Sequence, residues 1–235
     1  MSRHIPRIYC PDCNGEIFVV PEYQKNHMIN VLRMREGAQF LAFNEMKGEW
    51  LCEVREIQRA SISIGMIYQT REFVHAQKLA LAMCQIKPDN MKLVIEKCTE
   101  LGVTDFYLLK SEYTNYNNDI SKLRRIAILA SEQSERMDIP SITEERHLDE
   151  FVNNLPAEYM WFSAIERNRD ARYPLDVALL SGSPLGFIVG AEGGFSDNEK
   201  LLLKQNTIAI RLSENILRSE TAAIACIACA GMLKK

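Results

Sequence analysis

The C-terminal third of the chain holds two polar segments, and each lies where a β-type apolar run passes into a helical pattern. The first segment, residues 190–194, is rich in glycine and follows a buried-strand run at 185–189. After it, Ser196 and Glu199 have the spacing of a capping box, which predicts the start of a helix. Strands that alternate with helices in this way favour an α/β fold with a largely parallel sheet.

The second segment, residues 212–221, follows a β-type run at 208–212 and leads into an alanine-rich helix at 221–233, for which Ser219 is a candidate cap. In open α/β sheets, ligands bind at the carboxyl ends of strands, where both segments would lie. Glycine lets backbone N–H groups approach a ligand, and a helix N-terminus adds partial positive charge. The glycine loop alone is equally consistent with a tight turn, because it matches neither G-x-G-x-x-G nor a P-loop.

The first part of the chain has a different pattern, with short β-type runs at hairpin spacing and one short helix over residues 22–32. This pattern predicts a small β-barrel, and we place the domain boundary between residues 72 and 73. The runs are 17–20, 38–43, 50–57 and 61–68.

Beyond that boundary, strands and helices alternate. Pro88 starts a helix that Gly102 ends, and Asp119 is expected to cap a second helix that continues to Arg136. The strands predicted in this part are 79–86, 103–109 and 159–164.

Composition excludes several classes of protein. Of 235 residues, 47% are hydrophobic and 25% charged, which is ordinary for a folded soluble chain. No apolar stretch reaches the roughly 18 residues of a membrane span, and the N-terminus has no apolar signal-peptide core, so we expect a cytoplasmic location. The seven cysteines show no disulfide framework. Their two C-x-x-C pairs lie at opposite ends of the chain, so no metal site is predicted.

The net charge of −3 does not by itself indicate a nucleic-acid-binding protein. Basic residues nevertheless concentrate in the first part of the chain, where they could neutralise phosphates or simply cover a solvated surface. The candidates for RNA contact there are Arg3, Arg7, Arg33 and Arg35.

The glycine loop together with Leu-Arg-Ser-Glu-Thr at 217–221 resembles the cofactor-binding segments of SPOUT-class RNA methyltransferases, which use S-adenosylmethionine. Other segments of the chain occur in the same order as the characteristic segments of one family within that class. Over essentially its whole length, the chain resembles the bacterial ribosomal RNA small subunit methyltransferase E family, whose members methylate N3 of one uridine in 16S rRNA. The matching segments are 3–9, 31–37, 96–103, 111–112 and 131–134, with His27.

This resemblance implies an N-terminal PUA-like β-barrel that binds RNA, over residues 1–72, and a SPOUT methyltransferase domain over 73–235. It also implies a C-terminal trefoil knot, a homodimer, and a substrate in the small ribosomal subunit. Small residues of the final helix would suit close packing against a partner, and they would equally suit a tight monomeric core. The cofactor-binding residues that the resemblance implies are Gly190, Glu192, Gly193, Gly194, Leu212, Ile216, Leu217, Ser219 and Thr221.

The reaction itself indicates what catalysis requires. N3 of uracil carries a proton and is a poor nucleophile, so its developing negative charge must be stabilised by a cation or by hydrogen-bond donors. Arg218 is the candidate for this role, with an ion pair to Glu220 as the alternative. Glu132 and Arg136 match a family segment that faces the active site, whereas a solvated helix face would also explain Glu132. Glu192 could bind the cofactor or hold its own loop.

The chain departs from the family pattern at several positions. Ala191 stands where the family usually has proline, and Ser213 where it has glycine. Tyr113 replaces a common basic residue and could stack on a base instead. Basic residues are also replaced by Asn90, Asp138 and Asn215. These losses keep two alternatives open: a SPOUT methyltransferase with another RNA target, or an inactive RNA-binding assembly factor.

Overall fold

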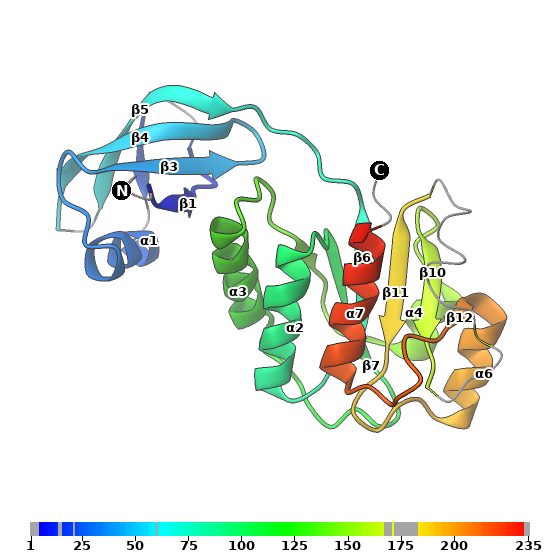
Figure 1. Cartoon of the computed structure of the whole chain (residues 1–235). Coiled ribbons are helices and arrows are strands. Elements are labelled where there is room, and N and C mark those ends of the chain that lie inside the picture. The colour runs from blue at the N-terminus through cyan, green and yellow to red at the C-terminus, as the bar shows by residue number, and fades with distance from the viewer. Residues whose placement is uncertain are drawn as a thin grey trace. The chain divides into compact units, whose positions relative to one another are not determined.

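The computed structural model describes residues 5–13, 16–20, 22–59, 61–166, 171 and 183–232 (Figure 1). The chain divides into two compact units. The first consists of Met1–His75 together with Ser131–Asp138, and the second of Ala76–Ala130 together with Ile139–Lys235. A single boundary near residue 72 does not describe this division, because residues 131–138 belong with the first unit.

The first unit is built on a five-stranded sheet in the order β1-β3-β4-β5-β2. Strand β1 runs parallel to β3, and the other neighbours are antiparallel. The edge strands have only three and four residues, and no pairing joins them in the described residues, so the predicted small β-barrel takes the form of a curled half-barrel. The bounds are β1 Arg7–Tyr9, β2 Ile17–Val20, β3 Gln39–Asn44, β4 Gly48–Ile57 and β5 Ile62–Arg71.

The predicted helix over 22–32 consists of two parts. An α-helix, α1 (Glu22–Asn26), continues directly into a π-helical turn, η1 (His27–Val31). The wider turn is visible in the bond from the Leu32 N–H to the His27 carbonyl, five residues back, at 3.1 Å. Met28 in this turn is fully buried in the core of the first unit.

The second unit contains a seven-stranded parallel sheet in the order β12-β10-β11-β6-β7-β8, with β9 also paired to β7. Every residue of the central strand β6 is buried, as expected where helices cover both faces of a sheet. The predicted parallel α/β architecture is thus confirmed. The strands are β6 Leu79–Cys84, β7 Asp105–Lys110, β8 Ser141–Ile142, β9 Arg146–His147, β10 Met160–Ala164, β11 Leu185–Val189 and β12 Ile208–Ile210.

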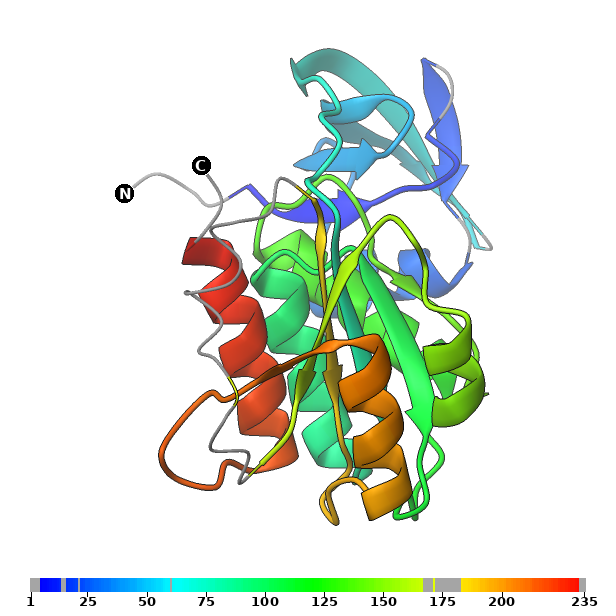
Figure 2. The same cartoon turned by 90° about the vertical axis from the view of Figure 1, so that its right-hand side faces the viewer.

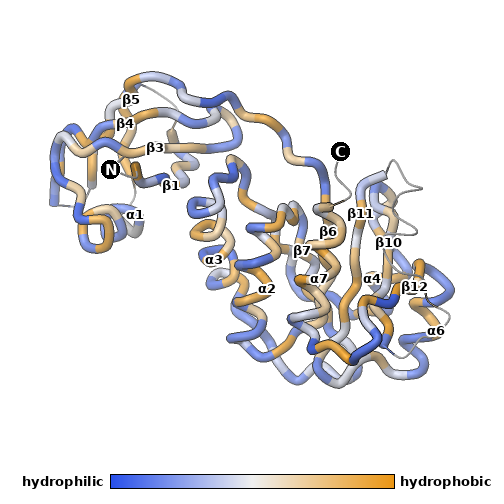
Figure 3. Tube along the Cα trace, viewed as in Figure 1, coloured by the Kyte–Doolittle hydropathy of each residue, from blue (hydrophilic) through white to orange (hydrophobic). Residues whose placement is uncertain are grey.

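Helices cover the two faces of this sheet (Figure 2). Helices α2 and α7 pack against each other on one face, and α7 contacts β11 and β6, while α4 and α6 pack together on the other. Figure 3 shows that α7 is apolar along much of its length. The bounds are α2 Pro88–Glu100, α3 Ile120–Gln133, α4 Leu148–Asn153, α6 Asp197–Asn206 and α7 Ser219–Met232.

Helix α3 ends at Gln133 instead of continuing to Arg136. Glu135 has a φ of 60°, and the Arg136 N–H bonds to the Ser131 carbonyl at 3.1 Å, which is a left-handed helix end made without glycine. At the other end, the Asp119 carboxylate accepts the Ser121 N–H at 2.9 Å, so the predicted cap is present. Among the described residues, no helix combines the length and the apolar character that crossing a bilayer requires.

Candidate functional site

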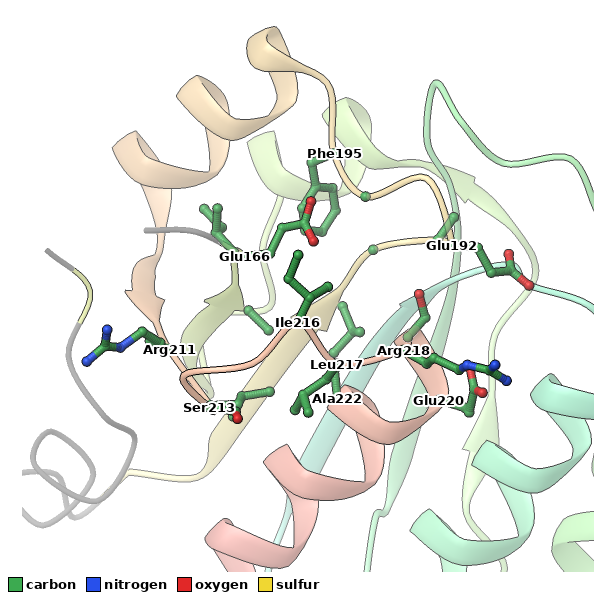
Figure 4. Close-up of a pocket in the computed structure, with 18 of the residues that line it drawn as sticks. Glu166, Glu192, Phe195, Arg211, Ser213, Ile216, Leu217, Arg218, Glu220 and Ala222 are labelled. Carbon is green, nitrogen blue, oxygen red and sulfur yellow. The ribbon is translucent and has the colours of Figure 1, made fainter. Parts of the chain in front are cut away.

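A pocket of about 1020 Å³ lies at the carboxyl ends of β10, β11 and β12 (Figure 4). Two loops form most of its wall, one that follows β11 (residues 190–195) and one that follows β12 (residues 211–218), and the first turn of α7 completes it. The pocket is therefore at the edge of the sheet where an open α/β fold binds its ligand.

The glycine loop is a tight turn and a pocket wall at the same time. The Gly194 N–H bonds to the Ala191 carbonyl at 2.9 Å, and Gly194 has a φ of 73°, a conformation that glycine adopts without strain. A Cβ at Gly190 would lie 3.2 Å from the Phe195 ring. The glycines thus allow both the turn and its close packing, and the two interpretations of this loop are compatible.

Two carboxylates fix the loop to its surroundings. Glu192 Oε1 accepts the Lys87 N–H at 3.1 Å, so Glu192 ties the loop to the start of α2 rather than to its own backbone. Glu199 Oε2 accepts the Ser196 N–H at 2.8 Å, and Ser196 Oγ accepts the Glu199 N–H at 3.4 Å. This is the predicted capping box of α6.

The loop after β12 presents apolar side chains to the pocket. Strand β12 ends at Ile210, two residues earlier than predicted, and the Asn215 N–H then bonds to Ser213 Oγ at 3.1 Å. Leu212, Ile216 and Leu217 line the pocket, and Ile216 is 59% exposed although it is apolar (Figure 4). Exposed apolar groups in a concave site are typical of a surface that a ligand covers.

Helix α7 begins two residues earlier than predicted. The Arg218 carbonyl accepts the Ala222 N–H at 2.8 Å, which puts Arg218 in the cap position and makes Ser219 the first helical residue. Ser219 therefore does not serve as the cap. Because the cap position moves to Arg218, the Arg218 side chain lies at the positive end of the helix, on the pocket wall.

Arg218 and Glu220 differ from the other charged groups of the pocket described so far, because neither has a protein partner for its charge among the described residues. Arg218 is exposed, and within the described part of the chain its guanidinium has no ion pair or hydrogen bond, so the alternative of a pair with Glu220 is not realised. Glu220 is only 8% exposed, and its Oε2 atom is buried with no hydrogen-bond partner among the residues that the structure describes. A buried carboxylate oxygen of this kind is costly unless a ligand or water donates to it.

Most of the predicted cofactor residues come together in this pocket. Gly193 instead lines an adjoining hollow, and Thr221 is exposed on the first turn of α7 but does not line the pocket. The predicted cofactor residues that do line it are Gly190, Glu192, Gly194, Leu212, Ile216, Leu217 and Ser219, and Arg218, predicted to be catalytic, lines it with them.

Sequence reasoning missed several other lining residues. Glu220 is the most informative of them, and its position two residues after Arg218 in the helix start was the available signal. Lys87 gave no signal, because only the fold brings the start of α2 to the pocket. The missed group also includes Glu166, Phe195 and Arg211.

Glu132 and Arg136, predicted to be catalytic, lie in the first unit and do not line the pocket. Glu132 Oε1 accepts the Tyr9 N–H at 3.0 Å, and Arg136 forms an ion pair with Asp138 at 2.6 Å. Burial raises the pKa of Glu132 to about 7, against the opposing effect of the Tyr9 N–H and of Arg7. Glu132 therefore holds the backbone of β1, whereas the Arg136 side chain is paired with Asp138 in its own segment.

The predicted RNA contacts differ in their availability. Arg7 has a side chain that is 4% exposed, bonds Glu49 at 2.5 Å and lies over the Phe43 ring at 4.3 Å, so it is not available to a phosphate. The prediction failed there because a cation that looks exposed in sequence is buried by a partner 42 residues away. Arg33 and Arg35 are exposed, and Arg3 lies outside the described residues.

Comparison with known proteins agrees with this geometry. Residues 74–231 match the RNA methyltransferase domain, and residues 21–65 match the RNA methyltransferase PUA domain. Ribosomal RNA small subunit methyltransferase E of Rickettsia conorii is 30% identical over 218 residues, which cover 92% of this chain and 89% of that protein. The chain belongs to the ribosomal RNA small subunit methyltransferase E family. The resemblance seen in the sequence is thereby confirmed.

Other members of this family show the same likeness along the whole chain. The Bacillus subtilis protein is 26% identical and covers 87% of this chain and 86% of its own length. The crystal structure of the Neisseria gonorrhoeae member, bound to S-adenosylmethionine, is 25% identical with a TM-score of 0.87 and covers 98% of both chains. A Legionella pneumophila methyltransferase solved with its cofactor SAM has 25% identity, a TM-score of 0.84 and 96% coverage of both chains.

Proposed function

We propose that this chain transfers a methyl group from S-adenosylmethionine to N3 of one uridine in 16S rRNA of the small ribosomal subunit. The observation that carries the proposal is the pocket at the sheet edge, where no described residue pairs with Arg218 or donates to the buried Glu220 Oε2. A ligand that donates to Glu220 Oε2 and carries or develops negative charge beside Arg218 would complete the site, and the ligand chemistry of this family suits both groups.

The residues of the pocket fit the cofactor. Ile216 and Leu217 offer apolar surface to an adenine ring, the glycine loop offers backbone N–H groups, and Glu220 Oε2 can accept a hydrogen bond from a hydroxyl or ammonium group. When bound, the cofactor supplies a methyl group on a sulfonium ion. The cofactor-binding set is Gly190, Glu192, Gly193, Gly194, Leu212, Ile216, Leu217, Ser219 and Thr221, with Glu220 added to it.

Arg218 has the properties that uracil chemistry requires. Loss of the N3 proton spreads negative charge over the two flanking carbonyl oxygens, and a fixed cation beside them lowers the barrier. Because no described carboxylate neutralises Arg218, its full charge is available for this purpose. Its position at the N-terminus of α7 adds the partial positive charge of the helix.

The first unit contributes RNA contacts in this proposal. Arg33 and Arg35 are exposed there, and each would neutralise one phosphate without selecting a sequence. We also retain the homodimer and the C-terminal trefoil knot, which rest on the resemblance. Light scattering tests the dimer directly, because a monomeric mass at working concentration would contradict it.

The test of the activity is methyl transfer from labelled S-adenosylmethionine to small ribosomal subunits that lack the modification, with the product nucleoside identified by mass spectrometry. We expect 3-methyluridine at one site. If the protein binds the cofactor but transfers no methyl group to these subunits, the proposed substrate is wrong, and a different RNA target or a role in assembly follows. Calorimetric titration with the cofactor alone separates these outcomes from a failure of the pocket itself.

A further inference from the structure

A second hollow of about 500 Å³ adjoins the pocket just described. Lys87 and Glu192 line both, so the two spaces meet at these side chains. Tyr113, Asn115, Tyr116 and Gly193 complete the second hollow. Of these residues, only Glu192, Gly193 and Tyr113 entered the predicted site, and no cofactor group requires a pair of tyrosines.

The loop that carries both tyrosines, residues 111–119 between β7 and α3, is held in place at both ends. At its start, the Ser111 N–H bonds to Thr114 Oγ1 at 2.9 Å and the Glu112 N–H bonds to Glu199 Oε1 at 2.8 Å. At its end, Asn118 donates its N–H to Gln85 Oε1 at 2.6 Å and its Nδ2 to the Ile86 carbonyl at 3.0 Å. The tyrosines are therefore presented on a fixed backbone, which reduces the entropy lost when a ligand binds.

The glycine loop packs directly on this segment. A Cβ added at Gly193 would lie 2.8 Å from the Tyr113 Cβ, which leaves no space for a side chain at residue 193. The wall of the cofactor pocket and the wall of the second hollow are thus in contact. A ligand in the hollow would lie immediately beside a ligand in the pocket.

The chemistry of the hollow is that of a nucleobase site. Tyr113 is 44% exposed, and within the described residues the hydroxyls of Tyr113 and Tyr116 and the Lys87 ammonium have no partner. Aromatic faces bind unpaired bases by stacking, and this is the usual way in which proteins hold single-stranded RNA. An ammonium group at the junction suits the carbonyl oxygens on the edge of a pyrimidine.

We propose that this hollow receives one unpaired pyrimidine base of the RNA substrate, stacked on Tyr113 and Tyr116 with its carbonyl edge towards Lys87. The inference rests on the proposed function, because it places the base that accepts the methyl group beside the cofactor pocket. A base must leave its stack to reach an enzyme site of this kind, and the tyrosines replace the stacking that it loses. The Asn115 side chain and the Tyr116 hydroxyl remain available for hydrogen bonds to the edge of the base.

The first test measures methyl transfer to small ribosomal subunits by Tyr113→Ala and Tyr116→Ala, alongside calorimetric binding of S-adenosylmethionine. We expect KM for the subunits to rise about 5- to 100-fold in each variant, the range that loss of one base–aromatic stack produces, with cofactor affinity within twofold of the wild type. Tyr113→Phe keeps the ring and should restore KM to within twofold. If both alanine variants keep the wild-type KM, the hollow does not hold the base.

A second test has a readout other than activity. An oligouridylate with one 5-bromouridine is irradiated with the full chain, and the cross-linked peptide is identified by mass spectrometry. We expect the cross-link in residues 111–119, and cross-links confined to other segments would overturn the proposal. Lys87→Met should reduce oligouridylate affinity, whereas Lys92→Met, which removes an exposed lysine of the same helix, should not.

These measurements separate the two proposals. If the wild type forms 3-methyluridine but Tyr113 and Tyr116 are dispensable, the base site is wrong and the function stands. If the wild type transfers no methyl group to the subunits but the oligouridylate cross-links to the 111–119 loop, the base site stands and the proposed substrate is wrong.

Discussion

The two units differ in whether their buried charged side chains have partners within the protein. In the first, Glu49 accepts Arg7 Nε at 2.5 Å on one oxygen, and Arg71 Nε at 2.9 Å and Thr70 Oγ1 at 2.8 Å on the other. Burial alone would raise the pKa of Glu49, but the hydrogen bonds from Arg71, Arg7 and Thr70 outweigh it and lower the pKa to about 2. This cluster is complete without any ligand.

In the second unit, the polar groups of the pocket are left incomplete. Within the described part of the chain, Glu220 Oε2 is buried without a partner and no carboxylate forms an ion pair with Arg218. An unsatisfied buried group lowers the stability of the free protein and is compensated when a ligand or a water donates to it. Both regions hold buried charge. What distinguishes the structural cluster from the binding site is that the charged groups of the cluster find all their hydrogen-bond and ion-pair partners within the protein.

The largest effect should come from breaking the saturated cluster. Glu49→Gln leaves Arg7 buried without a counter-charge, and we expect a loss of about 3–5 kcal/mol in the free energy of unfolding, measured by urea denaturation. Because the pKa of Glu49 is lowered from 4.5 to about 2, its contribution in the wild type is present above pH 4.5 and disappears as the pH falls towards 2. Arg55→Met, which breaks an exposed pair with Glu53, is the matched control and should change stability by less than about 1 kcal/mol. Equal losses in the two variants would contradict the comparison.

Removing the unpaired cation should affect the reaction and leave the fold intact. Arg218→Met is expected to lower kcat by about 100- to 1000-fold, the usual result of removing one group that stabilises developing negative charge. Its unfolding midpoint in urea should match the wild type, because no described residue pairs with Arg218. A destabilised variant would instead show that Arg218 is a structural residue.

Glu220→Gln tests the buried carboxylate of the pocket, whose Oε2 atom lacks a partner among the described residues. The amide keeps the shape but loses the charge and one acceptor, so we expect S-adenosylmethionine affinity to fall about 10-fold, the equivalent of a hydrogen bond to a charged group. The free protein should be as stable as the wild type or more so, since an unsatisfied carboxylate has been removed. Calorimetry and urea denaturation measure the two effects separately. Unchanged affinity would remove Glu220 from the cofactor site.

The smallest effect concerns Glu132, a carboxyl whose pKa is raised to about 7 by burial. A raised pKa means that its contribution to stability is fully present below pH 4.5 and is lost as the pH rises through 7. Glu132→Gln still accepts the Tyr9 N–H, so it should remove this pH dependence, which we expect to be about 1–2 kcal/mol between about pH 6 and pH 8. An unchanged slope of stability against pH would show that Glu132 is ionised throughout this range.

Local signals in the sequence predicted those parts of the fold that depend on neighbouring residues. The capping box of Ser196 and Glu199, the helix that Pro88 starts and the buried strand β6 all follow from patterns within a few residues. By contrast, β1 has only three residues, which is too short for a recognisable strand pattern. It is a strand because it pairs with β3, more than 30 residues later in the chain. The association of residues 131–138 with the first unit depends on Arg7, which donates to the Arg136 carbonyl at 3.1 Å from 129 positions away.

The same distinction applies to the site. The glycine loop and the segment around Arg218 were found because each lies at a strand-to-helix junction. Lys87 was missed because only the order of strands in the sheet brings the start of α2 beside the loop after β11. Arg7 was wrongly assigned to RNA because its charge is visible in the sequence, whereas its burial by Glu49 and Phe43 is not.

The contact between Gly193 and Tyr113 restricts how this protein can change over time. The clash at 2.8 Å involves the Cβ of residue 113, an atom that every amino acid except glycine carries. Any residue with a side chain at position 193 is therefore excluded while position 113 is not glycine. This contact sets no limit on which side chain stands at position 113, but residue 193 can diverge only after position 113 has lost its own side chain. Two positions 80 apart in the chain are thus tied to a fixed order of substitution.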